Sequence, residues 1–177
     1  MRSTILAFLF CGLACFAAIG PARAQTIVAL GASNTEGMGR GRTNMGVPRE
    51  QAYPAQLERL LRARGVNARV INAGIAGDTT AGMLARLDSA VPNGTSLLIL
   101  QPGGNDARRG AAPGERAANI AEIRRRMQAR GVPVVMLERL GAFNQWLLAD
   151  GQHYSAEGHA AMAAQLLPQV MAALGRR

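Results

Sequence analysis

The stretch 26-TIVALGASNTEG-37 decides the fold that this sequence predicts. Its first five residues, Thr26 to Leu30, form a short apolar run rich in β-branched side chains, which is typical of a buried strand. The glycine and small polar residues that follow end the strand and lead into a helical turn. The stretch therefore predicts a buried strand with polar side chains at its carboxyl end.

Three further runs of this kind follow along the chain, at Ala68 to Ile71, Ser96 to Leu100 and Val132 to Leu137. Segments with apolar residues at helical spacing lie between them, around Leu57, Met83 and Ile123. Strands that alternate with helices predict a parallel sheet covered on both faces. We expect an α/β fold, a three-layer α/β/α sandwich with a short, mainly parallel sheet of four or five strands.

A last helix is expected from Ser155 to Leu174, where apolar residues recur at steps of four. Ser155 is a suitable N-cap, and Pro168 is expected to kink or divide this helix because proline has no N–H to donate.

The 177 residues, 49% of them apolar and 18% charged, suffice for one domain with a hydrophobic core. Before that domain comes Arg2, an apolar run from Ile5 to Ile19, and Ala22-Arg23-Ala24, the pattern of a cleaved secretory signal. The run is shorter than the roughly 20 residues of a membrane span. We expect residues 1–24 to be the signal and residues 25–177 to be the mature domain. The mature protein is expected to be secreted to the periplasm and to have no stable membrane anchor.

Both cysteines, Cys11 and Cys15, lie in the expected signal, so the mature domain has no thiol for a disulfide or a metal site. The formal net charge is +9, and it falls to +7 when the signal is removed. Aromatic residues make up only 4%, and the densest basic run, 124–126, has helical surroundings. These features favour a solvated basic surface over nucleic-acid binding.

Polar and glycine-rich blocks follow the first three predicted strands: 31-GASNTEG-37, 72-NAGIAGDT-79 and 103-GGND-106. A fourth polar block, 150-DGQH-153, directly precedes the last helix. Open parallel sheets bind ligands at the carboxyl ends of their strands, so these blocks form the candidate site.

The residue types in these blocks are those of nucleophilic catalysis. Ser33 is a candidate nucleophile, His153 a candidate base, and Asp150 can accept the imidazole N–H within a tight turn. His159 is the other histidine, and it is disfavoured because it falls inside a helix without an adjacent carboxylate. Taken singly, Ser33 also fits a helix N-cap and Asp150 a surface carboxylate.

The four blocks, in this order, resemble the SGNH hydrolase superfamily, also called GDSL esterases or lipases, and look most like its bacterial periplasmic thioesterase and lysophospholipase branch. The resemblance covers nearly the whole mature chain and implies a flavodoxin-like fold. It also implies that Ser33 is the nucleophile, His153 the general base and acid, and Asp150 the orienting carboxylate. The implied oxyanion hole consists of the backbone N–H groups of Ser33 and Gly77 and the side-chain amide of Asn105. Neither a cofactor nor a metal ion is implied.

The sequence departs from the family pattern in two places. Ala32 and Asn34 flank Ser33 where the family usually has Asp and Leu, so the bonds that brace this turn must differ. Only 45 positions separate Asn105 from Asp150, fewer than is usual in the thioesterase branch. Residues 143–148 are expected to form a short helix that closes an acyl pocket, with Trp146 in its wall or, as we favour, in the core.

Arginines surround the candidate site in the sequence: Arg40, Arg42 and Arg49 follow the first block, and Arg108 and Arg109 follow the third. They either favour anionic substrates or form a plain solvated surface. The spacing of the glycines at 37–41 does not match a dinucleotide-binding loop.

The function expected from these observations is that of a secreted serine esterase. It would hydrolyse ester or thioester bonds of acyl-ester, lysophospholipid or aryl-ester type through a Ser-His-Asp triad and an acyl-enzyme. Two alternatives stay open: a carbohydrate O-deacetylase of the same superfamily, and a non-catalytic protein that binds acyl chains or glycans on this fold. The expected partner is a small-molecule, lipid or glycan ester, with no nucleic acid, and the protein is expected to be a monomer.

Overall fold

The computed structural model describes residues 24–38, 45–138 and 140–176. All but the last residue of the expected secretory signal, both cysteines, and Arg40 and Arg42 therefore lie outside the described residues.

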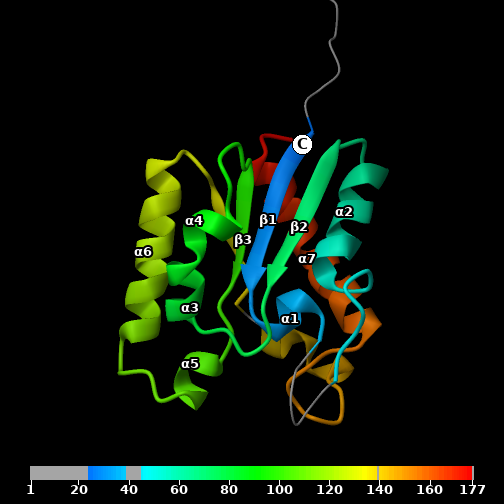
Figure 1. Ribbon diagram of the computed structural model, residues 1–177. Helices are drawn as coiled ribbons and strands as arrows, with labels where there is room; N and C mark the ends of the chain where they lie inside the picture. Colours follow the sequence, from blue (N-terminus) through cyan, green and yellow to red (C-terminus); the bar gives the residue numbers. More distant parts are fainter. Residues whose placement is uncertain (1–23, 39–44, 139, 177) are drawn as a thin grey trace, which may run out of the picture.

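A single parallel sheet forms the centre of the described molecule (Figure 1). Its spatial order is β2-β1-β3-β4, and its strands are β1 (Gln25–Gly31), β2 (Ala68–Gly74), β3 (Leu97–Gln101) and β4 (Val134–Met136). All four predicted strands are confirmed, and the described residues add no fifth strand to this sheet. The last strand is shorter than expected, since Pro133 in the predicted run has no N–H for the ladder.

Helices cover both faces of the sheet, which confirms the three-layer prediction. One layer consists of α2 (Tyr53–Ala63) and α7 (Ala156–Ala173), and the other of α3 (Thr80–Ala85), α4 (Leu87–Ala90) and α6 (Glu115–Ala129) (Figure 1). The segment around Met83 resolves into two short helices, α3 and α4, because Arg86 leaves helical geometry between them. Among the described residues, no helix is long and apolar enough to span a membrane.

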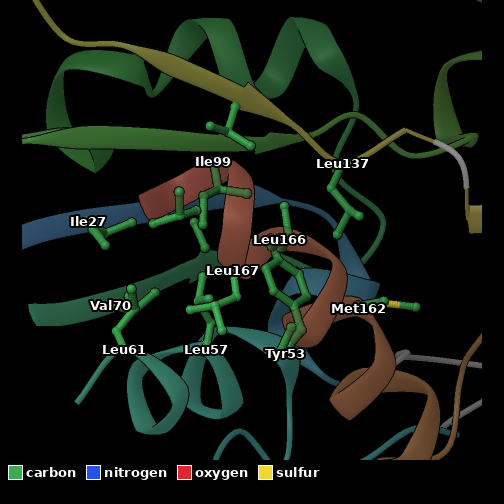
Figure 2. Packing of buried hydrophobic residues seen from close by; sticks show 14 of the residues in the cluster. Ile27, Tyr53, Leu57, Leu61, Val70, Ile99, Leu137, Met162, Leu166 and Leu167 are labelled. Atoms are coloured by element: carbon green, nitrogen blue, oxygen red, sulfur yellow. The ribbon is translucent and has the colours of Figure 1, made fainter. Parts of the chain in front are cut away.

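The core has two parts, because successive residues of a strand point to opposite faces. Ile27 and Ala29 of β1 pack toward α2 and α7, whereas Val28 and Leu30 pack toward α3, α4 and α6. All four are fully buried. Figure 2 shows the first part, with Leu57 and Leu61 of α2 facing the sheet.

The last helix is continuous, so of the two effects expected of Pro168, a kink or a division, the division does not occur. Ser155 is its N-cap, as predicted, and accepts a bond from the backbone N–H of Gly158 at 3.5 Å. Pro168 lies inside α7 without dividing it. Pro168 and Ala164, whose carbonyl loses its helical partner, are both exposed, so solvent can satisfy that carbonyl.

The strand order places a crevice at the carboxyl ends of the strands. From β1 the chain passes to β2 on one side and later to β3 on the other, so β1 and β3 flank the point where the winding reverses. Ligands bind at this point in open α/β sheets. The short helices α1 (Ser33–Glu36) and α5 (Asn105–Arg108) lie at this end of the sheet (Figure 1).

Candidate active site

Four of the five predicted site residues line one pocket at the carboxyl end of the sheet. The cavity measures about 450 Å³, and its walls include Ser33, Gly77, Asn105 and His153. The fifth residue, Asp150, lies behind His153 and bonds to it.

Ser33 owes its position to a sharp turn between β1 and α1. A side chain at Gly31 would meet Thr35 Oγ1 at 2.1 Å and the carbonyl of Gln101 at 2.9 Å, so this turn requires glycine. Ser33 is then the first residue of α1, and it stands in the pocket wall.

A chain of hydrogen bonds joins Ser33, His153 and Asp150. His153 Nε2 lies 2.9 Å from Ser33 Oγ, and His153 Nδ1 lies 2.5 Å from Asp150 Oδ2. An ionised carboxylate only accepts, so Nδ1 donates to Asp150 and, in the neutral imidazole, Nε2 accepts from the serine hydroxyl. The side chains of His153 and Asp150 are only 7% and 8% exposed, which strengthens their mutual interaction.

Opposing effects act on the pKa of Asp150. Burial raises the pKa, but hydrogen bonds from the His153 side chain and from the backbone N–H groups of His153 and Gln152 outweigh it and lower the pKa below its ordinary value. Both backbone bonds measure 3.0 Å and end on Oδ1. Asp150 is therefore ionised at neutral pH.

The turn that carries His153 is held at both ends. Leu147 and Tyr154 form an antiparallel bridge, and the N–H of Leu148 donates to the carbonyl of His153 at 2.8 Å. The side-chain amide of Asn34 donates to the carbonyl of Gln152 at 3.1 Å. Asn34 thus ties the serine helix to the histidine turn, a contact that a leucine at this position could not make.

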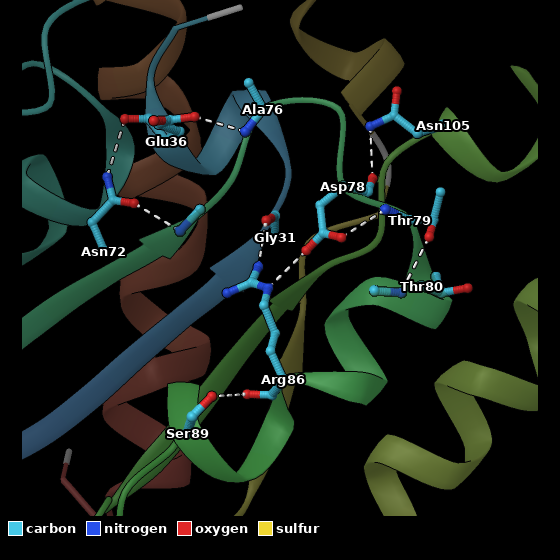
Figure 3. A network of polar contacts seen from close by, with 12 residues as sticks. Gly31, Glu36, Asn72, Ala76, Asp78, Thr79, Thr80, Arg86, Ser89 and Asn105 are labelled. Atoms are coloured by element: carbon cyan, nitrogen blue, oxygen red, sulfur yellow. Dashed lines mark hydrogen bonds and ion pairs between the residues drawn. The ribbon is translucent and has the colours of Figure 1, made fainter. Parts of the chain in front are cut away.

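Ala32, in the position where the family usually has Asp, is buried and offers no polar group. Arg86 of the opposite layer braces this region instead: it donates to the carbonyl of Gly31 at 3.2 Å and to Asp78 Oδ2 at 2.8 Å (Figure 3). The Arg86 side chain thereby connects the end of β1 with the loop that follows β2.

The predicted oxyanion donors Gly77 and Asn105 face the same cavity. Gly77 has a φ of +79°, a conformation that favours glycine. Asn105 Nδ2 donates to the carbonyl of Asp78 at 2.7 Å, and its Oδ1 accepts from Arg108 at 2.8 Å. Gly74, the alternative in the same block, packs against α1, where an added Cβ would lie 2.1 Å from the nitrogen of Glu36.

Sequence reasoning missed Glu36, which braces the second block from α1. Its carboxylate is buried and accepts from the N–H of Ala76 at 2.6 Å (Figure 3). The same carboxylate pairs with Arg49 at 3.4 Å. The side chain of Asn72 donates to the Glu36 carbonyl at 3.2 Å. Glu36 stands one helical turn after Ser33, but no local pattern marks it as buried.

His159 lies in the core and is not among the residues that line the pocket. Its Nδ1 accepts from the backbone N–H of Tyr53 at 3.2 Å. Burial, and then the charge of His153, lower the pKa of His159 to about 4. His159 is therefore a neutral core residue at physiological pH.

The segment expected to close the pocket differs from the prediction in its bounds and in its type of helix. It forms a 3₁₀-helix, η1 (Leu140–Trp146), that starts before the predicted 143–148. Leu140 lines the pocket, whereas Phe143 and Trp146 pack against the core of α2 and α7. The ring of Phe143 lies tilted against Trp146 and meets Tyr154 edge-on. Phe143 and Trp146 therefore contribute to the core and not to the pocket wall.

Three of the predicted arginines are described, and they differ in their surroundings. Arg49 pairs with Glu36, Arg108 lines the pocket, and Arg109 lies beside Gly77. Among the described residues, no group of three or more acidic, histidine or cysteine side chains is arranged to hold a metal ion.

Comparisons with known proteins show the family to which the chain belongs. A family model described as the GDSL-like Lipase/Acylhydrolase family matches residues 29–175. Esterase TesA of Pseudomonas aeruginosa is 35% identical over 117 residues, 66% of this chain and 55% of that protein. An arylesterase of Vibrio mimicus is 33% identical over 93 residues, 52% of this chain and 46% of that protein. This chain spans about half the length of these two relatives.

A crystal structure of TesA superimposes with a TM-score of 0.72 at 26% identity, and the match covers 85% of this chain and 100% of that one. The similarity therefore extends over most of this chain.

Proposed function

Because the chain belongs to the GDSL-like lipase/acylhydrolase family, we propose that it is a serine esterase in which Ser33, His153 and Asp150 form the catalytic triad. The observation that supports this proposal best is the continuous chain of hydrogen bonds from Ser33 Oγ through His153 to Asp150, at 2.9 and 2.5 Å. It stands beside two groups that can donate to an oxyanion, at Gly77 and Asn105.

In the acylation step, His153 Nε2 takes the proton of Ser33 while Oγ attacks the ester carbonyl carbon. Asp150 accepts a hydrogen bond from the Nδ1–H group, stays ionised, and stabilises the imidazolium that forms. The tetrahedral intermediate collapses when His153 gives its proton to the leaving alcohol oxygen, and the acyl group stays on Ser33.

In the deacylation step, His153 Nε2 takes a proton from water, whose oxygen attacks the acyl carbon. The second tetrahedral intermediate releases the carboxylic acid, and the proton returns to Ser33 Oγ. The backbone N–H groups of Ser33 and Gly77 and the amide of Asn105 donate to the oxyanion in both steps. Removing one such donor typically costs 10²-fold to 10³-fold in kcat.

The pocket walls favour short acyl groups. Only four of the described lining residues have apolar side chains: Ala32, Ala76, Leu140 and Tyr154. Each methylene contributes about 0.8 kcal/mol only where it is buried against an apolar wall. We therefore expect esters of short acids to react better than long-chain esters, a preference also compatible with O-deacetylation of carbohydrates.

We also propose export from the cytoplasm. The support is the basic start, the apolar run and the Ala22-Arg23-Ala24 site of the first 24 residues. Analysis of the N-terminus of the protein recovered after expression with residues 1–24 in place tests this, since a start at Gln25 is expected.

The experiment on activity is hydrolysis of p-nitrophenyl esters of increasing chain length by the protein from Gln25 onward. Ser33→Ala and His153→Ala are compared with Ser89→Ala, which removes an exposed hydroxyl from α4. We expect turnover in the wild type and in Ser89→Ala, and its loss in the other two. A folded wild type that neither hydrolyses these esters nor labels with a fluorophosphonate would contradict the proposal and favour a binding protein.

A further inference from the structure

Arg108 makes a contact that the chemistry described so far does not use. It is the last residue of α5, and it lies one helical turn after Asn105 on the same side of that helix. Its Nη2 atom donates to Asn105 Oδ1 at 2.8 Å. The guanidinium also lines the pocket beside Gly104, where an added Cβ would lie 3.3 Å from Nη1.

The two ends of the Asn105 amide are therefore both occupied. Nδ2 donates one of its two protons to the carbonyl of Asp78 at 2.7 Å, and Oδ1 accepts from Arg108. Turning the amide by 180° would break both bonds and would direct a carbonyl oxygen at the place where an oxyanion forms. The second Nδ2 proton is thus kept as the group that faces the cavity.

The charge of Arg108 adds to this effect. Among the described residues, the one polar contact of the Arg108 guanidinium is the Asn105 amide, and no carboxylate neutralises its charge. A cation on the amide oxygen withdraws electrons from the amide and makes its N–H a better donor, because bonds in a chain polarise one another. The same positive charge acts on the oxyanion directly.

We propose that Arg108 is a positioning residue of the oxyanion hole: it fixes the orientation of the Asn105 amide and strengthens its donation to the transition state. This inference rests on the proposed esterase function. Because the oxyanion is absent from the bound ester and develops only as the tetrahedral intermediate forms, the loss of Arg108 should lower kcat and leave KM unchanged.

The kinetic test uses a neutral ester, p-nitrophenyl acetate, with Arg108→Ala and Arg108→Lys. Arg125→Ala is the matched control, because it removes the same charge from an exposed position on α6. We expect kcat to fall about 10-fold to 100-fold in Arg108→Ala. Arg108→Lys should recover part of the loss, since an ammonium still donates to Oδ1, and Arg125→Ala should match the wild type.

A second measurement does not depend on turnover. The side-chain amide of Asn105, assigned by the signal missing in Asn105→Ala, is observed in ¹H–¹⁵N spectra. We expect its two proton shifts to move in Arg108→Ala and to stay in place in Arg125→Ala.

Unchanged amide shifts in Arg108→Ala would overturn the proposal, as would a wild-type kcat on the neutral ester. A rise of KM confined to esters with an anionic acyl group, such as a succinate monoester, would instead make Arg108 a substrate-charge receptor and overturn it as well. If the wild type hydrolyses no ester, the esterase function fails, and the amide shifts still decide whether Arg108 holds Asn105.

Discussion

At the scale of the residue, the two nitrogens of His153 have different partners. Nδ1 faces the carboxylate of Asp150, and Nε2 faces the hydroxyl of Ser33. The carboxylate selects the tautomer, because it can only accept a hydrogen bond from Nδ1. The backbone bonds to Asp150 Oδ1 hold this carboxylate in place, so in the neutral imidazole the nitrogen that faces the serine is an acceptor.

Replacing Asp150 by Asn tests this arrangement. The amide can donate to Nδ1 and so stabilise the tautomer in which Nε2 carries the proton. A protonated Nε2 cannot accept a hydrogen bond from Ser33. We expect kcat on a neutral ester to fall roughly 10³-fold to 10⁴-fold. Asp88→Asn, which changes an exposed carboxylate on α4, is the control. Near wild-type turnover of Asp150→Asn would exclude Asp150 as the orienting group.

At the scale of the element, α1 and the end of β2 touch backbone to backbone. Gly74 permits this approach, and the carboxylate of Glu36 then reaches the N–H of Ala76 at 2.6 Å. Because Gly77 follows directly, this contact between α1 and β2 determines where both the serine and one expected oxyanion donor stand.

The substitution Gly74→Ala, which adds a methyl group, tests whether α1 and the end of β2 are in close backbone contact. Its Cβ would lie 2.1 Å from the backbone nitrogen of Glu36, so main-chain atoms must move. We expect Gly74→Ala to lower the free energy of unfolding by about 1 to 3 kcal/mol, as overpacking does. Esterase activity should fall with it. Gly141→Ala, where no atom lies within 4 Å, should change stability by less than about 0.5 kcal/mol. Urea denaturation of both variants decides this.

The contact of α7 with the start of α2 predicts a dependence of stability on pH. The pKa of His159 is about 4 in the folded protein and about 6.5 in the unfolded chain. Between these values the unfolded state binds a proton that the folded state excludes. The stabilisation from neutral His159 is therefore complete above about pH 6.5, and about 3 kcal/mol of it is lost as the pH falls toward 4.

The variant His159→Gln keeps an acceptor for the N–H of Tyr53 but does not titrate. Its free energy of unfolding should decrease less over this pH range than that of the wild type. His153→Gln, the control with the other histidine removed, should retain the decrease caused by His159. Urea titrations across the range, followed by the fluorescence of the single tryptophan, measure the difference. Equal slopes in His159→Gln and the wild type would refute the assignment.

At the scale of the whole molecule, stability depends on two hydrophobic layers that share one sheet. Ile99 of β3 packs toward α2 and α7, and Leu98 packs toward α3, α4 and α6. Both are fully buried, and the pocket lies at the end of the strands that carry them. Loss of either layer should therefore unfold the site together with the sheet.

Truncation in the centre of the sheet tests this coupling. Ile99→Ala and Leu98→Ala should each cost about 2 to 5 kcal/mol, from lost burial and the cavity that remains. Each should still unfold in one transition, with activity and fluorescence changing together. Ile75→Ala, at a side chain that is 47% exposed, should stay within about 0.5 kcal/mol of the wild type. Separate transitions for activity and fluorescence would show that the layers are independent.

The sequence by itself determined the order of strands and helices, the parallel sheet, and the rim where Ser33, Gly77, Asn105 and His153 meet. The strands, the helices and the rim follow from local signals: apolar runs, helical spacing, and blocks of polar residues at strand ends. The choice of Gly77 and Asn105 within those blocks came from the family resemblance. Asp150 and His153 could be paired because they are three positions apart.

Only the tertiary structure decided which distant residues support the site. Glu36 reaches Ala76, Arg86 reaches Gly31, Asn34 reaches Gln152, and His159 accepts from Tyr53. The pocket wall at Leu140 and the length of η1 also emerged only there. The physical reason is that these contacts depend on how elements pack, and packing is not recorded in the spacing of residues along any one segment.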